Sequence, residues 1–133
     1  MAGLNGVRVE IEGWDELESK LRKLAANLNT QEVMENALMD GAEIVKGALE
    51  AGAPRRTGQL AGDIHISKQG RQKYSVRVGP GIRGFYGRYL EYGTSRMAAR
   101  PWMRPAFDGV QASVERAISD SMWRAVEEAN DRA

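Results

Sequence analysis

The apolar residues of this chain change their spacing along the sequence, and this change limits the possible folds. Over 7–11, and again over 64–67 and 74–78, apolar and polar residues alternate, which is typical of strands that bury one face. Over 14–51 and from 105 to about 129, apolar residues instead recur with the period of amphipathic helices. The pattern predicts an α+β fold, in which a small, mainly antiparallel sheet packs against two or three long helices.

The sheet is expected to combine a β-hairpin with an N-terminal strand. The hairpin would run over 64–67 and 74–78, around a polar tip at 68–73. Since a two-stranded hairpin is only marginally stable alone, it needs the 7–11 strand, a helix or a neighbouring subunit beside it.

Local signals indicate where the helices begin. Asn29, followed by Glu32, resembles a capping box at the start of the second long helix, and Thr30 is the other cap candidate. Pro105 suits the first turn of the last helix. Residues 85–92 hold four of the nine aromatic residues and are predicted to form a short helix or a bent segment.

Length and composition exclude several classes of protein. The 133 residues suit one domain over 1–133, with frayed ends at 1–6 and 130–133. Cysteine is absent and His65 is the single histidine, which excludes disulfides and thiolate sites and disfavours zinc or triad chemistry. We therefore expect no metal and no cofactor. No apolar run approaches the ~20 residues of a membrane span, and the first residues do not resemble a signal peptide. We expect synthesis in the cytoplasm and no membrane partner.

Charge is segregated along the chain, although the net charge is only +1. Residues 53–104 carry eleven basic and two acidic side chains, a net of +9, whereas the rest of the chain has a net of −8. Such segregation is typical of recognition by complementary fields; the alternative is that arginines simply solvate a loop-rich segment. The candidates for contact with DNA or with a neighbouring subunit are Arg55, Arg56, Arg83, Arg96, Arg100 and Arg104.

Glu91 is the one acidic residue of the aromatic segment and the best candidate for a catalytic acid. An aromatic pocket can raise the pKa of a carboxyl group, as general-acid catalysis requires. Acid–base catalysis also needs a second group, for which Asp63 and His65 are the nearest candidates. The favoured interpretation is that Glu91 pairs with a nearby arginine, that His65 is a surface residue, and that the protein is not an enzyme.

Two sequence blocks carry a resemblance to a known family. The first is Ala53-Pro-Arg-Arg-Thr-Gly-Gln-Leu60; the second is Tyr86-Gly-Arg-Tyr-Leu-Glu-Tyr-Gly-Thr-Ser-Arg96, followed by Pro101-Trp-Met-Arg-Pro-Ala-Phe107. In this order, from about Trp14 to Ala129, the chain resembles small head–tail connector proteins of long-tailed bacteriophages and prophages, called neck, tail-completion or minor tail components. It departs from that family at Trp102, where phenylalanine is usual, and at Asp63, where serine is common.

The resemblance implies a structural virion protein of the neck or tail, without a catalytic site. It implies a homo-oligomeric ring, with a hexamer and a dodecamer as candidates, through which DNA passes and which contacts other connector and tail proteins. The candidate assembly contacts are Tyr89, Glu91, Tyr92, Thr94, Pro101, Trp102 and Pro105. Trp102 is favoured among them as an exposed aromatic anchor. The alternative is a stand-alone nucleic-acid-binding module that uses the basic segment 53–104.

Overall fold

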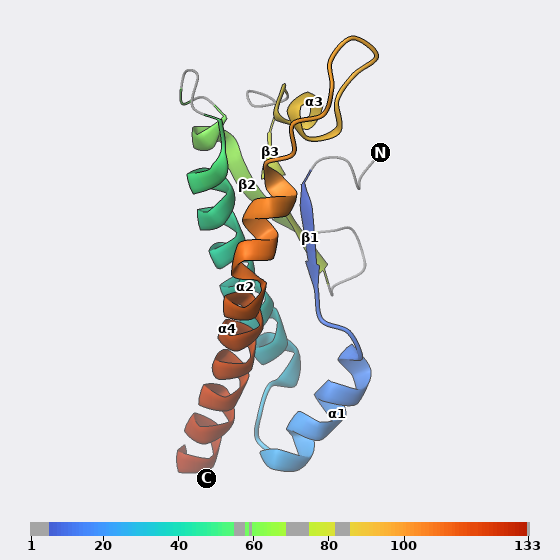
Figure 1. The fold of residues 1–133 in the computed structure, drawn as a ribbon. Helices are drawn as coiled ribbons and strands as arrows, with labels where there is room; N and C mark the ends of the chain where they lie inside the picture. Colours follow the sequence, from blue (N-terminus) through green and yellow to red (C-terminus); the bar gives the residue numbers. More distant parts are fainter. Residues whose placement is uncertain (1–5, 55–57, 59, 69–74, 82–85, 133) are drawn as a thin grey trace.

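A long antiparallel helix pair and a small sheet make up the fold. The computed structural model describes residues 6–54, 58, 60–68, 75–81 and 86–132. The elements follow in the order β1 (Val7–Glu10), α1 (Trp14–Leu24), α2 (Thr30–Gly52), the short 3₁₀ turn η2 (Ala61–Asp63), β2 (Ile64–Lys68), β3 (Ser75–Pro80), α3 (Tyr86–Tyr92) and α4 (Met103–Arg132). In Figure 1, α2 and α4 run side by side along an elongated molecule, with α3 at one end and α1 at the other. The predicted α+β class is confirmed.

The sheet has three antiparallel strands in the order β1-β3-β2. The central strand is β3, since β1 and β2 both pair with it. Val9 lies opposite Val76 and Ile66 lies opposite Val78, so apolar residues of all three strands share one face. The prediction of a hairpin completed by an N-terminal strand is therefore confirmed, and the hairpin tip at 69–74 lies outside the described residues.

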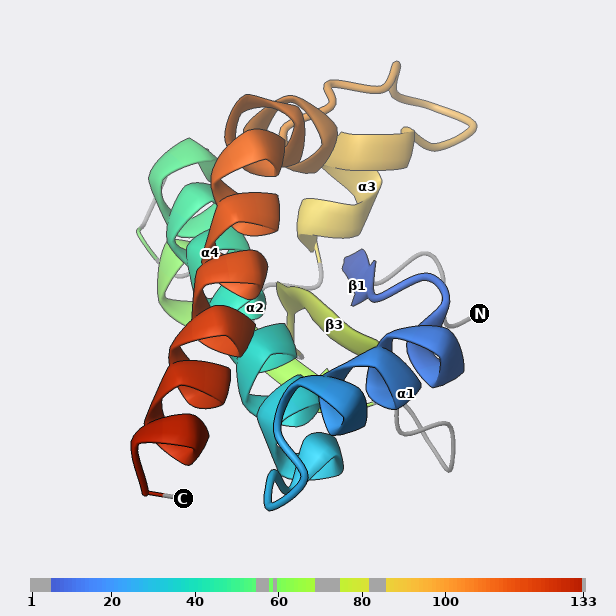
Figure 2. The same ribbon diagram turned by 90° about the horizontal axis from the view of Figure 1, so that it is seen from below.

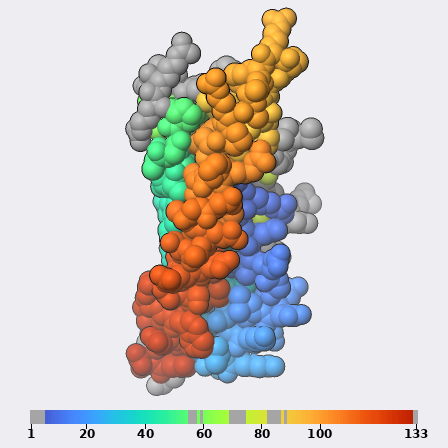
Figure 3. Space-filling model, in the orientation of Figure 1, coloured from blue at the N-terminus to red at the C-terminus, as the bar shows by residue number. Residues whose placement is uncertain are grey.

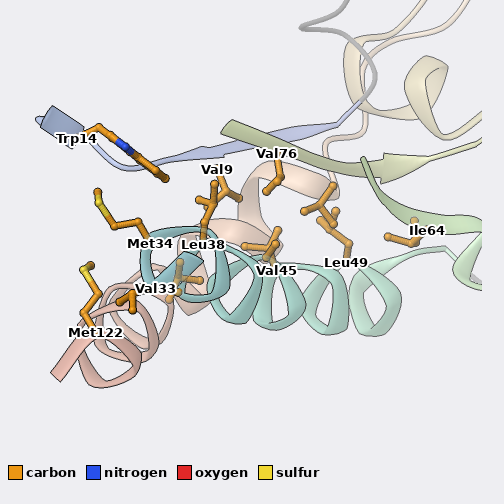
Figure 4. Close-up of a cluster of buried hydrophobic side chains, with 14 of the residues drawn as sticks. Val9, Trp14, Val33, Met34, Leu38, Val45, Leu49, Ile64, Val76 and Met122 are labelled. Carbon is orange, nitrogen blue, oxygen red and sulfur yellow. The ribbon is translucent and has the colours of Figure 1, made fainter. Parts of the chain in front are cut away.

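The apolar face of the sheet packs on α2, and this contact holds much of the core. Helix α2 contacts all three strands and also contacts α1 and α4, and Figure 2 shows it between α4 and the sheet. Val45 and Leu49 are fully buried, and Leu38 is nearly so. In Figure 4 these side chains face Val9 and Val76 of the sheet. The apolar stripe of α2 and the alternating apolar residues of the strands thus pack against each other in one core.

Asn29 caps the start of α2, as its spacing to Glu32 predicts. The Asn29 side-chain oxygen accepts the backbone N–H of Glu32 at 3.3 Å, and its amide donates to Oε2 of Glu32 at 3.3 Å. Thr30, the other candidate, is the first residue within the helix.

Helix α4 is longer than the sequence predicts. It runs to Arg132, past the expected end at about Ala129, and thus includes residues 130–132, for which we expected fraying. Ala129 is fully buried, and its carbonyl oxygen accepts a hydrogen bond from Nδ2 of Asn27 at 3.2 Å. This contact ties the last turn of α4 to the connection between α1 and α2. The predicted frayed start, 1–6, lies outside the described residues except for its last position.

Small residues on α2 allow α4 to approach closely. A Cβ atom on Gly41 would lie 2.9 Å from Cδ1 of Ile118 and 3.2 Å from Cγ1 of Val114. Nearer the other end of the pair, a Cβ atom on Gly52 would lie 3.3 Å from the Cβ of Ala106. The absence of side chains at these two positions therefore sets the distance between the helices.

We predict opposite effects for the same substitution at two glycines of α2. Gly47→Ala should raise the free energy of unfolding by about 0.5–1 kcal/mol, because alanine favours the helix and the added Cβ has open space. Gly41→Ala should be at least about 1 kcal/mol less stable than Gly47→Ala, because the methyl group overpacks against Ile118. Urea unfolding followed by circular dichroism measures both. Equal stabilities for the two variants would contradict the close approach of α2 and α4.

Candidate assembly surface around helix α3

The second sequence block forms the end of the molecule that lies opposite α1. It comprises α3, the loop 93–101 and the first turn of α4. Figure 1 shows the loop projecting beyond α3 at this end. The side chains of this block that are buried can hold the fold together, and those that face solvent can contact a partner.

Glu91 lies inside, at the junction of α3 and α4. Its side chain is buried, and Oε1 accepts the backbone N–H groups of Trp102 at 2.6 Å and Met103 at 2.7 Å. Oε2 accepts the backbone N–H of Arg104 at 3.3 Å. The first N–H groups of a helix have no partner within it, so a carboxylate there satisfies them and complements the helix dipole. Glu91 thus caps the N-terminus of α4, although it lies eleven residues before Trp102 in the sequence.

Arg104 completes the contacts of Glu91. Its Nε donates to Oε2 of Glu91 at 3.0 Å, while its side chain stays 66% exposed. The guanidinium carbon lies 5.8 Å from the centroid of the Tyr92 ring, within range of a cation–π interaction. The prediction that Glu91 pairs with a nearby arginine is confirmed.

The surroundings of Glu91 favour its ionised form. Burial raises the pKa of this carboxyl group, but the hydrogen bonds from Met103, Trp102 and Arg104 together outweigh burial and hold the pKa below its ordinary value of 4.5. A general acid needs the opposite shift and access to its substrate. The carboxylate of Glu91 has neither, and its oxygens are used in holding α4.

Trp102 is buried, so the expectation that it is an exposed anchor is wrong. It is 6% exposed, and its Nε1 donates to the carbonyl oxygen of Gly87 at 2.9 Å. A Cβ atom on Gly87 would lie 3.0 Å from Cζ2 of Trp102 and 2.7 Å from Cδ1 of Leu60. The two sequence blocks therefore meet at Gly87. Sequence reasoning missed this burial because the partners of the indole lie far from Trp102 along the chain.

The loop after α3 is exposed, yet backbone hydrogen bonds fix its path. Thr94 and Met97 exchange two such bonds, of 2.8 Å and 3.3 Å, and the N–H of Arg100 donates to the carbonyl oxygen of Leu90 at 2.6 Å. The loop thus closes on itself and is tied back to α3.

Gly93 makes the turn out of α3 possible. Its φ is +76°, a conformation that side chains disfavour, and a Cβ atom there would lie 2.8 Å from the N of Ala99 and 2.9 Å from the O of Met97. Both the backbone conformation and the crowding require glycine.

Apolar and basic side chains gather on the outside of this end. Tyr89 is 44% exposed, Tyr92 is 42% exposed and Met97 is 36% exposed. We call the exposed set the α3 surface: Tyr89, Tyr92, Thr94, Arg96, Met97, Arg100 and Arg104. Sequence reasoning did not select Met97, although a large apolar residue in a polar loop could have indicated it.

The remaining predicted contacts are divided between exposed and undescribed positions. Pro101 and Pro105 are exposed, and Pro105 lies in the first turn of α4 as predicted. The basic candidates Arg55, Arg56 and Arg83 lie outside the described residues.

Asp63 and His65, the other candidates for catalysis, pair with each other. Oδ1 of Asp63 lies 2.7 Å from Nε2 of His65, whose side chain is 62% exposed, so the prediction of a surface histidine is confirmed. In the part of the chain that the structure describes, no cluster of three or more potential metal-ligating side chains occurs. No helix among the described residues is both long enough and apolar enough to span a membrane.

The described residues form a small α+β protein with exposed aromatic and basic side chains around α3. A family model described as "Bacteriophage HK97-gp10, putative tail-component" matches residues 15–93, more than half of the chain. The protein belongs to this family of phage tail components. The match includes the first sequence block and ends within the second, at Gly93, so the similarity noted over 101–107 lies beyond it. No curated protein and no solved structure matches the chain.

We predict that Glu91→Gln destabilises the fold by about 2–4 kcal/mol, because one carboxylate oxygen becomes an N–H₂ group that faces buried donors. Arg104→Met keeps the aliphatic stem but removes the charged partner of Glu91, while the three backbone N–H donors to the carboxylate remain, so its cost should be smaller, about 1–2 kcal/mol. Denaturant unfolding of both variants measures the difference. A loss for Glu91→Gln as small as that for Arg104→Met would show that the cap is unimportant.

The lowered pKa of Glu91 also predicts an acid-sensitive contribution to stability. Because the folded pKa lies below the unfolded value, the contribution is fully present above pH 4.5 and is lost as the pH falls through the folded pKa. Unfolding free energies measured across this range should therefore fall more steeply in the wild type than in Glu91→Gln. Parallel pH profiles would contradict the assignment of this acid sensitivity to Glu91.

Proposed function

We propose that this phage tail component acts in the head–tail connector, as a neck or tail-completion protein of a tailed phage or prophage. Copies of the chain assemble as a ring through which DNA passes, and the α3 surface makes contacts with neighbouring copies or with the next connector component. The role is structural and involves no catalysis.

The observation that carries this proposal is an exposed surface that is already fixed before any partner binds. Glu91 and Trp102 hold α3 against the start of α4, and the loop behind Tyr89 and Tyr92 is closed by backbone bonds. Exposed aromatic side chains contribute strongly to the binding free energy of protein interfaces. A surface that needs no ordering on docking keeps more of its binding free energy.

Charge supports assembly between copies. The α3 surface presents Arg96, Arg100 and Arg104, whereas the residues outside 53–104 carry a net charge of −8. A ring built from two different patches of each subunit can bring such opposite charges together. The same arginines would also favour non-specific contact with the phosphates of passing DNA.

A second candidate function is a stand-alone nucleic-acid-binding module. The exposed Arg96, Arg100 and Arg104, gathered at one end of the molecule, favour it. This function requires the isolated monomer to bind DNA with an affinity that falls steeply as salt rises. Connector assembly requires no such binding by the monomer, so a DNA titration at several salt concentrations separates the two functions.

We predict that Tyr89→Ala and Arg100→Glu each reduce the yield of infectious particles at least about tenfold in a phage that carries the substitution, because both alter the α3 surface. Electron micrographs should then show unjoined heads and tails. The matched control is Arg116→Glu, an equal change of charge on an exposed residue of α4.

Thermal unfolding of the purified variants must first show that their stability is unchanged. Normal particle yield from both α3-surface variants, with the proteins folded, would contradict an assembly role for this surface.

A further inference from the structure

A second exposed apolar region lies at the other end of the molecule, between α1 and α4. Both helices pack on α2, but they leave between them a groove with a volume of about 430 Å³. Leu17, Leu21 and Leu24 of α1 form one wall, and Ile118, Met122 and Val126 of α4 form the other. Figure 3 shows the C-terminal half of α4 and α1 side by side at the lower end of the molecule.

Trp123 stands at the rim of this groove and is 55% exposed, while Leu24 on the opposite rim is 47% exposed. The other two tryptophans, Trp14 and Trp102, are 5% and 6% exposed. Trp123 lies beside the apolar stripe of α4, next to the exposed Asp120 and Glu127, and it is not among the buried residues of the core. An exposed tryptophan beside an apolar groove is typical of an interaction surface.

The groove and the residue that could fill it belong to the same patch. Trp123 lines the groove of its own chain, so two copies that face each other can each place an indole in the groove of the other. Such an exchange is mutual, which is the property of a twofold, isologous contact.

Charges around the groove favour a second copy as the occupant. Lys20 lines the α1 side of the groove and Glu115 lines the α4 side, and the exposed Asp120 and Glu127 flank Trp123 on α4, one turn before and one turn after it. When α4 of one copy lies along the groove of another, these acidic residues approach Lys20 of that copy. The twofold axis repeats the arrangement, so the complementary charges act twice.

We infer that the groove between α1 and α4 is a self-association site, in which two copies of this chain exchange Trp123 across a twofold axis. Because Trp123 is only 55% exposed in its own chain, pairing would bury on the order of 100 Å² more of each indole. The contact is therefore smaller than a standard interface, and the pairing should be weak and dependent on concentration.

This pairing is independent of the proposed ring contact, because the groove and the α3 surface lie at opposite ends of the molecule (Figure 1). A twofold contact closes on itself and does not extend around a ring. Within a ring assembly, it would pair two rings or hold free chains as dimers before assembly.

Sedimentation velocity of the 133-residue protein over a range of concentrations tests the inference. The wild type should approach the mass of a dimer at high concentration and that of a 14.7 kDa monomer on dilution. Trp123→Ala should raise the dimer dissociation constant at least about tenfold. Tyr89→Ala, an exposed aromatic residue at the other end, should leave it unchanged, which separates this site from the α3 surface.

Two further measurements identify the contact. Acrylamide quenching of tryptophan emission should fall as concentration rises, because Trp123 is the exposed tryptophan among the three. Lys20→Glu should weaken the dimer, and added salt should do the same. A wild type that stays monomeric up to about 1 mM would overturn the inference. So would a dimer insensitive to Trp123→Ala, one in which Trp123 stays equally quenchable, or one that responds neither to Lys20→Glu nor to salt.

Discussion

The buried carboxylate of Glu91 is the contact on which the exposed end of this molecule depends. A helix usually takes its N-terminal cap from the residues just before it. Helix α4 instead takes its cap from α3, through Glu91 and the N–H groups of Trp102 and Met103. The indole of Trp102 adds a second link, to the carbonyl oxygen of Gly87. Hydrogen bonds to both carboxylate oxygens compensate for the water that the buried charge loses. These bonds keep α3 in a fixed orientation relative to the long helix pair.

This arrangement divides the chain into a scaffold and two presented surfaces. The scaffold is α2, with the sheet on one side and α4 on the other, joined closely where Gly41 lies against Ile118. The α3 surface at one end mixes aromatic and basic side chains, whereas the groove at the other end is apolar and rimmed by opposite charges. The two proposed contacts therefore differ in chemistry, and a change to one surface should leave the other unaffected.

Much of this fold could be predicted from the sequence, because its signals are local. Alternation around Val76 and the spacing from Asn29 to Glu32 depend on neighbours a few residues away, and both predictions are confirmed. The pairing of Glu91 with an arginine followed from a local excess of basic residues. The burial of Trp102 did not follow, because its pocket is built from Gly87 and from Leu60 of a different sequence block. The groove beside Trp123 could not be predicted either, because its walls come from α1 and α4, which are far apart in the sequence.

Among the described residues, the strand order β1-β3-β2 leaves each outer strand paired on one side only. Open strand edges can recruit any extended peptide, and copies of one chain at high local concentration are at particular risk. Here the outer strands are only four and five residues long, and they carry Arg8, Glu10 and Lys68 as charged, exposed side chains. Short edge strands with charged side chains discourage the edge-to-edge pairing of sheets that leads to fibrils.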